Sequence, residues 1–378
     1  MVRNIRSASY VQRDDMTRFG ASSPVMRRPS HLALALVLSL PLFTATGCAS
    51  CGQSTVGALS GPLNAPANKT LRRQILSYGI GQFCTEMLKH DAPLQLAPDQ
   101  PVIGRFYPRT CNTKEMENGD LFVSFSGVGY AWTNLSKKLA FDMNGSVQYN
   151  QDFLMDGSTM YAYFRTRQVQ SSEFKTRVIE QPVASFLNQL TPLGDNFGKQ
   201  LVQSKLAEGF TVIRDKDGNA DFSLGVVELG KKPQHPFDVH GSSRITYENT
   251  RVEVHQNQRD FVGPIVVEDS GRALFVTGTM DGSPPIDVLF LRKDEAETSI
   301  GYYTTYAQIG PLGGQPFYGE VMQTGVPYSR TVPVPKGTYY VVFDNSSSAG
   351  QVAPFVNPLD DRAAVVSYVV QLGDAPTP

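Results

Sequence analysis

GDLFVSFSGVGYAW, residues 119–132, is the stretch that decides the fold of the first half of this chain. Its apolar residues alternate along the chain, first on one face at Leu121, Val123 and Phe125 and then on the other at Val128, Tyr130 and Trp132. An alternation of period two is typical of a strand that buries one face. The change of face near Gly127 indicates a bulge or a bend. The stretch therefore predicts a strand of an antiparallel sheet.

Turn signals extend this strand into a meander. Asn144-Gly145 and Asp156-Gly157 each lie between alternating runs, and both dipeptides are typical of tight β-hairpins. A further hairpin is predicted over residues 209–225, around the polar turn DKDGN. That turn does not fit an EF-hand, because Ile213 would occupy the first ligand position of a calcium loop. The economical interpretation is an antiparallel meander.

Two amphipathic helical stretches flank the predicted meander. Apolar residues recur at helical spacing within residues 71–90 and again within residues 182–209, where Pro192 breaks the pattern and Gly209 ends it. The sequence therefore predicts an α+β domain over residues 70–226. Its architecture is similar to that of lipid-binding envelope lipoproteins, in which a curved sheet wraps a helix around an apolar groove.

The second half of the chain shows no helical period and predicts an all-β sandwich over residues 247–374. A polar segment with Pro and Gly, residues 227–246, is the predicted linker between the two domains. Strands are expected at residues 250–254, 273–279, 286–291, 300–306, 329–334, 339–343 and 364–372. The last of these is apolar on both faces, which favours a place in the middle of a sheet.

The closing segment carries a resemblance. PKGTYYVVFDNSSSAG followed by AAVVSYVVQLG resembles the last strands of GOLD-type (Golgi-dynamics) β-sandwiches, with a turn at Gly337, a strand from Tyr339 to Phe343 and a turn at Asp344-Asn345. The resemblance implies protein or lipid-linked binding rather than chemistry. It departs from the family in that no transmembrane helix follows, and other jelly-roll modules fit nearly as well.

The N-terminal region has the pattern of an export signal. A basic pair, Arg27-Arg28, precedes an apolar run from Leu32 to Phe43 that is shorter than the roughly 20 residues of a transmembrane helix. Ala45-Thr46-Gly47-Cys48 then resembles a lipobox, the processing site of bacterial lipoproteins, with Ala45 where leucine is usual. The resemblance implies a signal peptide over residues 1–47 and acylation of Cys48. The alternative is an ordinary signal peptide and a soluble secreted protein.

Residues 48–69 are small, polar and dotted with Pro and Gly, and they predict a flexible tether. Ala49 follows the lipidated position, where an aspartate would resemble a signal for retention in the inner membrane. We therefore expect a lipid-anchored protein of the outer membrane in the cell envelope, facing either the periplasm or the surface.

Composition argues against nucleic acid as a partner. Removal of residues 1–47 takes away six of the 34 basic and two of the 35 acidic residues, which leaves 28 and 33 and a net charge of −5. A mildly acidic chain without a basic stripe does not favour nucleic acid. The apolar and aromatic content is that of a globular protein.

The cysteines predict one disulfide. With Cys48 acylated, Cys84 and Cys111 form the better pair, because both lie within predicted structure while Cys51 lies in the tether. The alternative is that these two are buried thiols. Cys51 is left free or paired with a partner chain.

The candidate ligand site is a set of aromatic side chains on the meander. Apolar pockets are built from convergent aromatic residues, and the expected lining is Tyr130, Trp132, Tyr161, Tyr163 and Phe164. The alternative is that these residues form an ordinary core.

No motif of known mechanism occurs, and we expect a non-enzymatic protein without a cofactor that binds a lipid, a protein partner or both. Two alternatives stay open. His235, Asp238 and His240 lie in the linker, with His255 further along the chain, and a metal-dependent hydrolase would use the three linker residues. A calcium-dependent adhesion module would use the acidic turns at Glu268-Asp269, Asp281, Asp344-Asn345 and Asp360-Asp361.

The anchor gives the first testable prediction. Cys48→Ser removes the thiol that carries the lipid and should move the protein from the membrane fraction to the soluble fraction, because no other apolar segment holds it there. Cys51→Ser is the matched control and should stay with the membrane. Membrane attachment of an unacylated Cys48→Ser protein would contradict the anchor.

Overall fold

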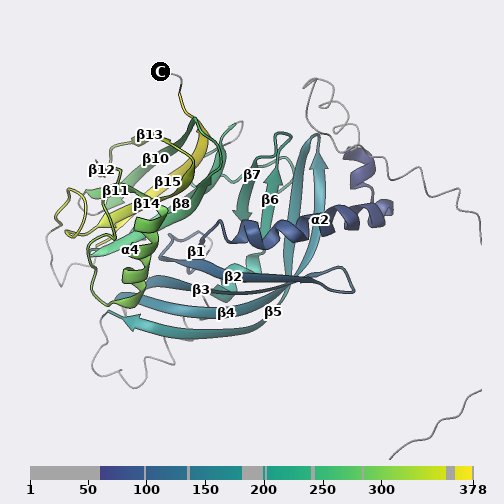
Figure 1. The fold of residues 1–378 in the computed structure, drawn as a ribbon, viewed down its shortest axis with the longest axis horizontal. Coiled ribbons are helices and arrows are strands. Elements are labelled where there is room, and N and C mark those ends of the chain that lie inside the picture. The colour runs from purple at the N-terminus through teal and green to yellow at the C-terminus, as the bar shows by residue number, and fades with distance from the viewer. Residues whose placement is uncertain are drawn as a thin grey trace, which may run out of the picture. The chain divides into compact units, whose positions relative to one another are not determined.

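The computed structural model describes residues 60–376 apart from residues 98, 134–136, 181–198, 201, 240–242, 283–284 and 355–361. The signal peptide, the lipobox with Cys48, and Cys51 lie outside the described residues. In the described part the protein is mostly β, with few helices (Figure 1). No described helix is both long enough and apolar enough to span a membrane.

The first half forms one antiparallel sheet of seven strands in the order of the chain. The strands are β1 (Ala92–Leu94), β2 (Gly104–Glu115), β3 (Leu121–Thr133), β4 (Lys137–Asp156), β5 (Thr159–Ile179), β6 (Phe210–Arg214) and β7 (Ala220–Leu224). The meander is therefore present, and the hairpins at Asp156-Gly157 and at residues 209–225 are confirmed.

The sheet curls because β4 and β5 are long and irregular. One half of this strand pair lies beside β2 and β3, and the other half beside β6 and β7, with register shifts between the two. Helix α2 (Lys69–Met87) crosses the curled sheet and packs on β2 and β4 (Figure 1). Its residues Ile75, Leu76, Ile80 and Phe83 join the aromatic core of the sheet, as expected from their helical spacing.

The predicted turn at Asn144-Gly145 is wrong. Both residues lie within β4, where Gly145 pairs with Phe125 of β3. A Cβ atom on Gly145 would lie 2.7 Å from the Phe125 ring. Glycine is therefore needed here to admit an aromatic ring rather than to turn the chain. The predicted bulge near Gly127 is found on the neighbouring strand, where the register shifts between Pro108 and Thr110.

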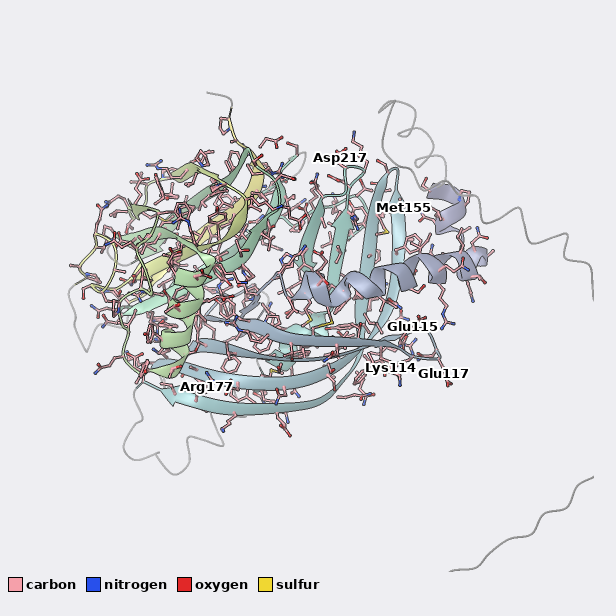
Figure 2. All side chains as sticks on the ribbon, in the orientation of Figure 1. Lys114, Glu115, Glu117, Met155, Arg177 and Asp217 are labelled. Carbon is pink, nitrogen blue, oxygen red and sulfur yellow. A yellow bond between two sulfur atoms is a disulfide. The ribbon has the colours of Figure 1, made fainter. Side chains whose placement is uncertain are left out.

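The part of the predicted tether that the structure describes, residues 60–69, is largely helical. Residues 60–64 are helical, and the 3-10 helix η1 (Pro66–Asn68) leads directly into α2. The Asn64 amide donates to Met155 O at 2.8 Å and accepts from Met155 N at 2.7 Å. Strand β3 stops pairing with β4 at Tyr149, so the edge of β4 beyond it needs other partners. Asn64 supplies them at Met155, and Arg72 donates to Phe153 O. Figure 2 labels Met155 on this part of the strand.

The second half forms two four-stranded antiparallel sheets. One has the order β13 (Tyr328–Val334), β10 (Arg272–Gly282), β15 (Ala364–Asp374), β8 (Ile245–Val254), and the other the order β12 (Tyr318–Met322), β11 (Ile286–Arg292), β14 (Gly337–Asn345), β9 (Gln258–Val267). Side chains from both sheets share one apolar core, as in a β-sandwich. Strand β15 lies inside its sheet, as the two apolar faces predict.

The predicted strand over residues 300–306 is wrong, because helix α4 (Lys293–Thr305) occupies this segment. Acidic Asp294 and Glu295 stabilise its first turn. Ala296, Ile300 and Tyr303 are spaced by four and three residues and all are buried, so the helical signal was present among the β-branched and aromatic residues. Two strands were also missed, β9, which contains Pro264, and the short β12.

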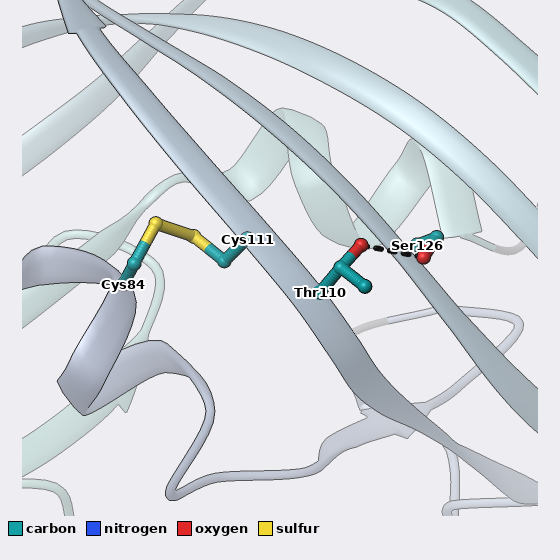
Figure 3. Close-up of a disulfide and its surroundings, with 4 residues drawn as sticks. All are labelled: Cys84, Thr110, Cys111 and Ser126. Atoms are coloured by element: carbon teal, nitrogen blue, oxygen red, sulfur yellow. Dashed lines mark hydrogen bonds between the residues drawn. A yellow bond between two sulfur atoms is a disulfide. The ribbon is translucent and has the colours of Figure 1, made fainter.

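A disulfide ties helix α2 to the sheet. Cys84 on α2 and Cys111 on β2 are bonded (Figure 3). On the neighbouring residue of β2, Thr110 shares a hydrogen bond of 2.5 Å with Ser126 of β3. The predicted pair is therefore the one that the structure contains.

Removal of this disulfide should destabilise the protein. Replacing Cys84 and Cys111 together by serine opens a loop closed over a sequence separation of 27 residues and should lower the free energy of unfolding by about 3.5 kcal/mol in the chain-entropy model. Urea unfolding of the oxidised wild type and the double variant measures the difference. Equal stabilities would show that the bond does not form in the native protein.

Candidate functional site

The most distinctive polar group of the structure is Arg105 of β2, whose side chain is 0 % exposed. It donates to both carboxylate oxygens of Asp260 on β9, at 2.7 and 2.6 Å, and to Glu248 Oε2 on β8 at 2.7 Å. It also donates to the Tyr368 hydroxyl on β15 at 2.6 Å and to Asp91, which directly precedes β1. The five N–H donors of the guanidinium are thus all used.

The network carries an excess of acidic groups. One guanidinium faces three carboxyl groups, Asp91, Glu248 and Asp260, and these side chains are at most 10 % exposed. Burial raises the pKa of Asp91 to about 7, although Arg105 opposes the shift. Burial also raises the pKa of Glu248 against the same opposing charge. Desolvation therefore outweighs the single positive charge at these two carboxyl groups.

Two tyrosines bind Asp260 and the backbone of the next residue, Phe261. The Tyr130 hydroxyl donates to Asp260 Oδ1 at 3.0 Å and accepts from Phe261 N at 3.0 Å. The Tyr107 hydroxyl donates to Phe261 O at 2.6 Å. Both rings pack with Tyr303 of α4 in a shared core cluster. Tyr130, a predicted ligand residue, therefore joins the seven-stranded sheet to the sandwich.

A cavity of about 680 Å³ lies beside this network. Its lining comes from the edge strands of all three sheets, at Pro93 of β1, residues 222–224 of β7, residues 247–250 of β8 and residues 262–265 of β9. Asp91 and Glu248 both lie in its wall. The buried carboxyl groups thus border a space large enough for a small molecule.

Other charged groups of the cavity wall have partners of their own. Lys205 is 7 % exposed and donates to Gln95 Oε1 at 2.7 Å, with Glu208 at 3.2 Å. His90 stacks on Phe222 with ring centroids 4.8 Å apart. Burial, with a smaller effect of Lys89, lowers the pKa of His90 to about 4. His90 is therefore uncharged at neutral pH, and Lys205 is balanced by Glu208.

The five predicted aromatic ligand residues do not converge. Phe164 belongs to the core under α2, and Tyr161 and Tyr163 form a separate cluster with Ile213. Trp132 stacks on His255 at 3.3 Å between ring centroids. Successive residues of a strand point to opposite faces, which separates Tyr163 from Phe164. These side chains belong to hydrophobic cores or to the junction between the seven-stranded sheet and the sandwich. The sequence analysis gave an ordinary core as the alternative to a ligand site.

The predicted metal residues are dispersed. His235 and Asp238 are exposed, His255 pairs with Glu253 at 3.0 Å, and His240 lies outside the described residues. No group of three or more His, Cys, Asp or Glu side chains able to hold a metal ion occurs in the described ranges.

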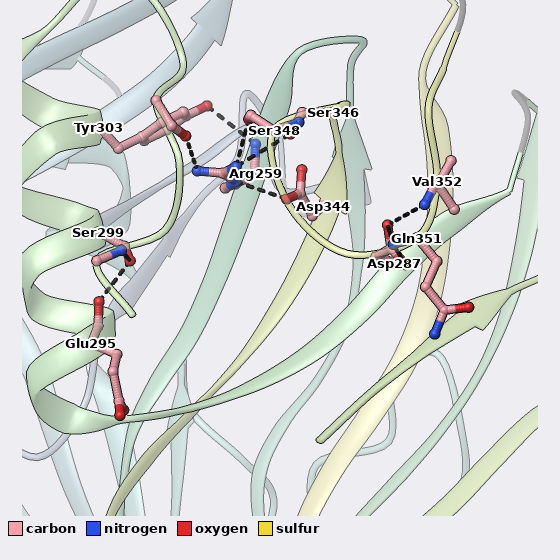
Figure 4. A network of polar contacts seen from close by, with 12 residues as sticks. Arg259, Asp287, Glu295, Ser299, Tyr303, Asp344, Ser346, Ser348, Gln351 and Val352 are labelled. Atoms are coloured by element: carbon pink, nitrogen blue, oxygen red, sulfur yellow. Dashed lines mark hydrogen bonds and ion pairs between the residues drawn. The ribbon is translucent and has the colours of Figure 1, made fainter. Parts of the chain in front are cut away.

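Asp344-Asn345, one of the acidic turns named for calcium, is buried at the end of β14. Arg259 donates to Asp344 at 2.9 Å, to Ser348 at 2.7 Å and to Gly310 O at 2.7 Å (Figure 4). Burial raises the pKa of Asp344 to about 6 in spite of Arg259. This second network fixes loops of the sandwich. Asp360-Asp361, also named for calcium, lies outside the described residues.

Sequence reasoning missed Asp91, Arg105, Glu248 and Asp260. They lie on four separate segments, and each looks like a solvent-facing position of its own strand or loop. The sequence did contain one sign of a buried ionic group, the charged pair Arg259-Asp260 at the start of an otherwise apolar run.

Comparisons with known proteins give no family. No protein family model matches this sequence, and no curated protein matches it. Among solved structures, the chain is similar to an exo-β-1,3-galactanase of Phanerochaete chrysosporium, solved with galactose, at 8 % sequence identity and a TM-score of 0.17. The similarity covers 72 % of this chain and 70 % of that chain. A similarity of this size carries no argument about fold or function.

The buried carboxyl of Asp91 gives a prediction about pH. Its pKa of about 7 in the folded protein lies above the ordinary value of 3.8. Between these two pH values the folded state therefore keeps a proton on Asp91 that the unfolded state has released. The free energy of unfolding of the wild type, relative to Asp91→Asn, should therefore fall as pH rises from about 4 to about 7, by up to about 4 kcal/mol.

Urea unfolding at a series of pH values measures this difference. Asp217→Asn, at an exposed turn labelled in Figure 2, is the control, and its difference from the wild type should change little because the side chain is hydrated in both states. A wild-type advantage over Asp91→Asn that grows with pH would contradict the assignment.

Proposed function

We propose that this chain is a lipid-anchored binding protein of the bacterial cell envelope that holds a small molecule in the cavity beside Asp91 and Glu248. The export signal and the lipobox-like sequence ending at Cys48 support the anchor and a place at the outer membrane. The protein is non-enzymatic in this proposal and uses no cofactor.

The cavity is the observation that carries the binding function. Its volume of about 680 Å³ lies within the range of roughly 300 to 1,000 Å³ typical of small-molecule sites. Two buried carboxyl groups and the aromatic residues Phe222 and Tyr247 line it. A polar ligand suits this wall better than the lipid expected from the sequence, because an acyl chain would leave the carboxyl groups unsolvated.

The finer fold assignment belongs to the same proposal. Helix α2 packed on the curled sheet supports an α+β domain over residues 70–226, and β14 and β15 support a GOLD-like or jelly-roll sandwich over residues 247–374. Such a sandwich fits a protein partner as a second ligand.

A hydrolase is the second candidate function, favoured by one observation. The pKa of Asp91 is raised to about 7, chiefly by burial, and a carboxyl group near neutrality in a cavity wall can act as a general acid or base. Glu248 binds the same Arg105 nitrogen and is the available second carboxyl group. Turnover of a bound molecule, instead of its recovery unchanged, would select this function.

Native mass spectrometry tests the binding function. Protein purified from its own host should carry an added mass of a small molecule. Val226→Trp places an indole at a cavity-lining position that is 49 % exposed and should abolish the added mass. Val326→Trp, at a position that is 53 % exposed on the β12–β13 turn, is the matched control and should retain it. Equal loads in the two variants would exclude the cavity as the site.

A further inference from the structure

A row of aromatic rings forms part of the cavity wall. The rings belong to Phe210, Phe222, His90 and Tyr247, and successive ring centroids are 5.2, 4.8 and 5.9 Å apart. Phe210 lies in the core under α2, whereas the other three residues line the cavity and are half-buried. The row is therefore fixed to the core at Phe210, and its remaining rings offer aromatic surface to a ligand.

The charges in the cavity wall are nearly balanced. The charged side chains of the lining are three lysines and four carboxyl groups, which are Lys205, Lys231, Lys232, Asp91, Glu208, Glu228 and Glu248. Burial raises the pKa of Asp91 to about 7, so this carboxyl group is partly protonated at neutral pH. Three positive charges thus meet between three and four negative charges, and the wall as a whole favours neither a cation nor an anion.

The lysines of the wall are paired or hydrated. Lys205 is 7 % exposed and pairs with Glu208 at 3.2 Å, and Lys232 pairs with Asp221 at 3.6 Å. Lys231 is exposed, so water weakens its attraction for a ligand. An anionic ligand would have to displace one of the two carboxylates or lose its hydration without a counter-ion, and both are costly. A cationic ligand would compete in the same way with Lys205 for Glu208.

A hydroxyl group suits this wall, because it both donates and accepts hydrogen bonds and carries no charge. Glu208 lines the cavity, and its side chain is 26 % exposed. An ionised carboxylate has about four acceptor sites, so Glu208 keeps acceptor capacity beside its pair with Lys205. Gln95 Oε1 accepts from Lys205 at 2.7 Å, and Gln95 lies in the same wall. A ligand rich in hydroxyl groups can therefore bond here and leave the internal pairs intact.

A sugar ring combines hydroxyl groups with a surface for aromatic packing. The hydroxyl groups project from the rim of the ring, and C–H groups cover its faces. These C–H groups are weakly positive and are attracted to the negative face of an aromatic ring. The cavity, with a volume of about 680 Å³, has room for such a ring.

We propose that the cavity binds a neutral sugar, whose ring packs on the aromatic row at Tyr247 and whose hydroxyl groups bond to Glu208 and Gln95. The inference rests on the proposed binding function and names the class of its ligand. The aromatic row supplies the packing surface, and the balanced and paired charges of the wall are the reason for a ligand without charge.

Three pairs of sugars test the class of ligand. Glucose with glucuronate, mannose with mannuronate, and N-acetylglucosamine with glucosamine each match a neutral sugar to a charged one of the same ring. Isothermal titration calorimetry with the wild type should show binding of at least one neutral sugar. Its charged counterpart should bind at least about tenfold more weakly, because its charge meets no free counter-ion in the wall. This comparison needs no variant.

A pair of variants assigns the packing to Tyr247. Tyr247→Leu removes the ring, keeps an apolar side chain and should weaken binding of that neutral sugar by about two- to tenfold, which is the range of an aromatic contact. Tyr302→Leu is the same change at a position of α4 that is 51 % exposed and does not line the cavity, and it should leave the affinity unchanged. Circular dichroism checks that both variants are folded.

The outcomes separate this inference from the proposed function. A charged sugar that binds as tightly as its neutral counterpart would overturn the neutral class and leave the cavity a ligand site. Failure of all three neutral sugars would overturn the sugar, while the mass carried by protein from its host decides independently whether the cavity is a binding site. Equal affinities of Tyr247→Leu and the wild type would overturn the packing on Tyr247.

Discussion

The buried guanidinium of Arg105 is the interaction on which the rest of the structure depends. It reaches from the seven-stranded sheet to β8, β9 and β15 of the sandwich and to the segment before β1. Burying an ion costs several kcal/mol, and only well-placed partners offset that cost. Because all five donors are satisfied, the two halves of the chain have one low-energy arrangement at this point. The tyrosine pair Tyr107 and Tyr130 extends the same junction to α4.

The same network that joins the halves also determines the chemistry of the cavity. Asp91 and Glu248 border the space between the sheet edges, and burial raises the pKa of both carboxyl groups. An apolar lining would have favoured the lipid that the N-terminal half suggested. The curled sheet itself does not provide the expected groove, because the side chains of α2, among them Phe83, fill its concave face together with Phe164.

Much of the fold could be predicted from periodicity, and little of the site. Strands with one buried face, helix α2 and the central place of β15 all follow from local alternation. The turn at Asn144-Gly145 was wrongly predicted because Gly145 makes room for the ring of Phe125, a contact between strands. The strand over residues 300–306 was wrongly predicted because the buried residues of α4 include types that favour strands. The site could not be predicted because Arg105 and its acidic partners, up to 155 residues away in Asp260, show no local pattern until the sheets meet.

The titration of the Asp91 carboxyl group by carbon-13 NMR tests this account most directly. Burial beside an already shared guanidinium should give the free protein a pKa near 7 at this carboxyl. An ordinary pKa near 4 would contradict the burial of this carboxyl group in the wall of the cavity.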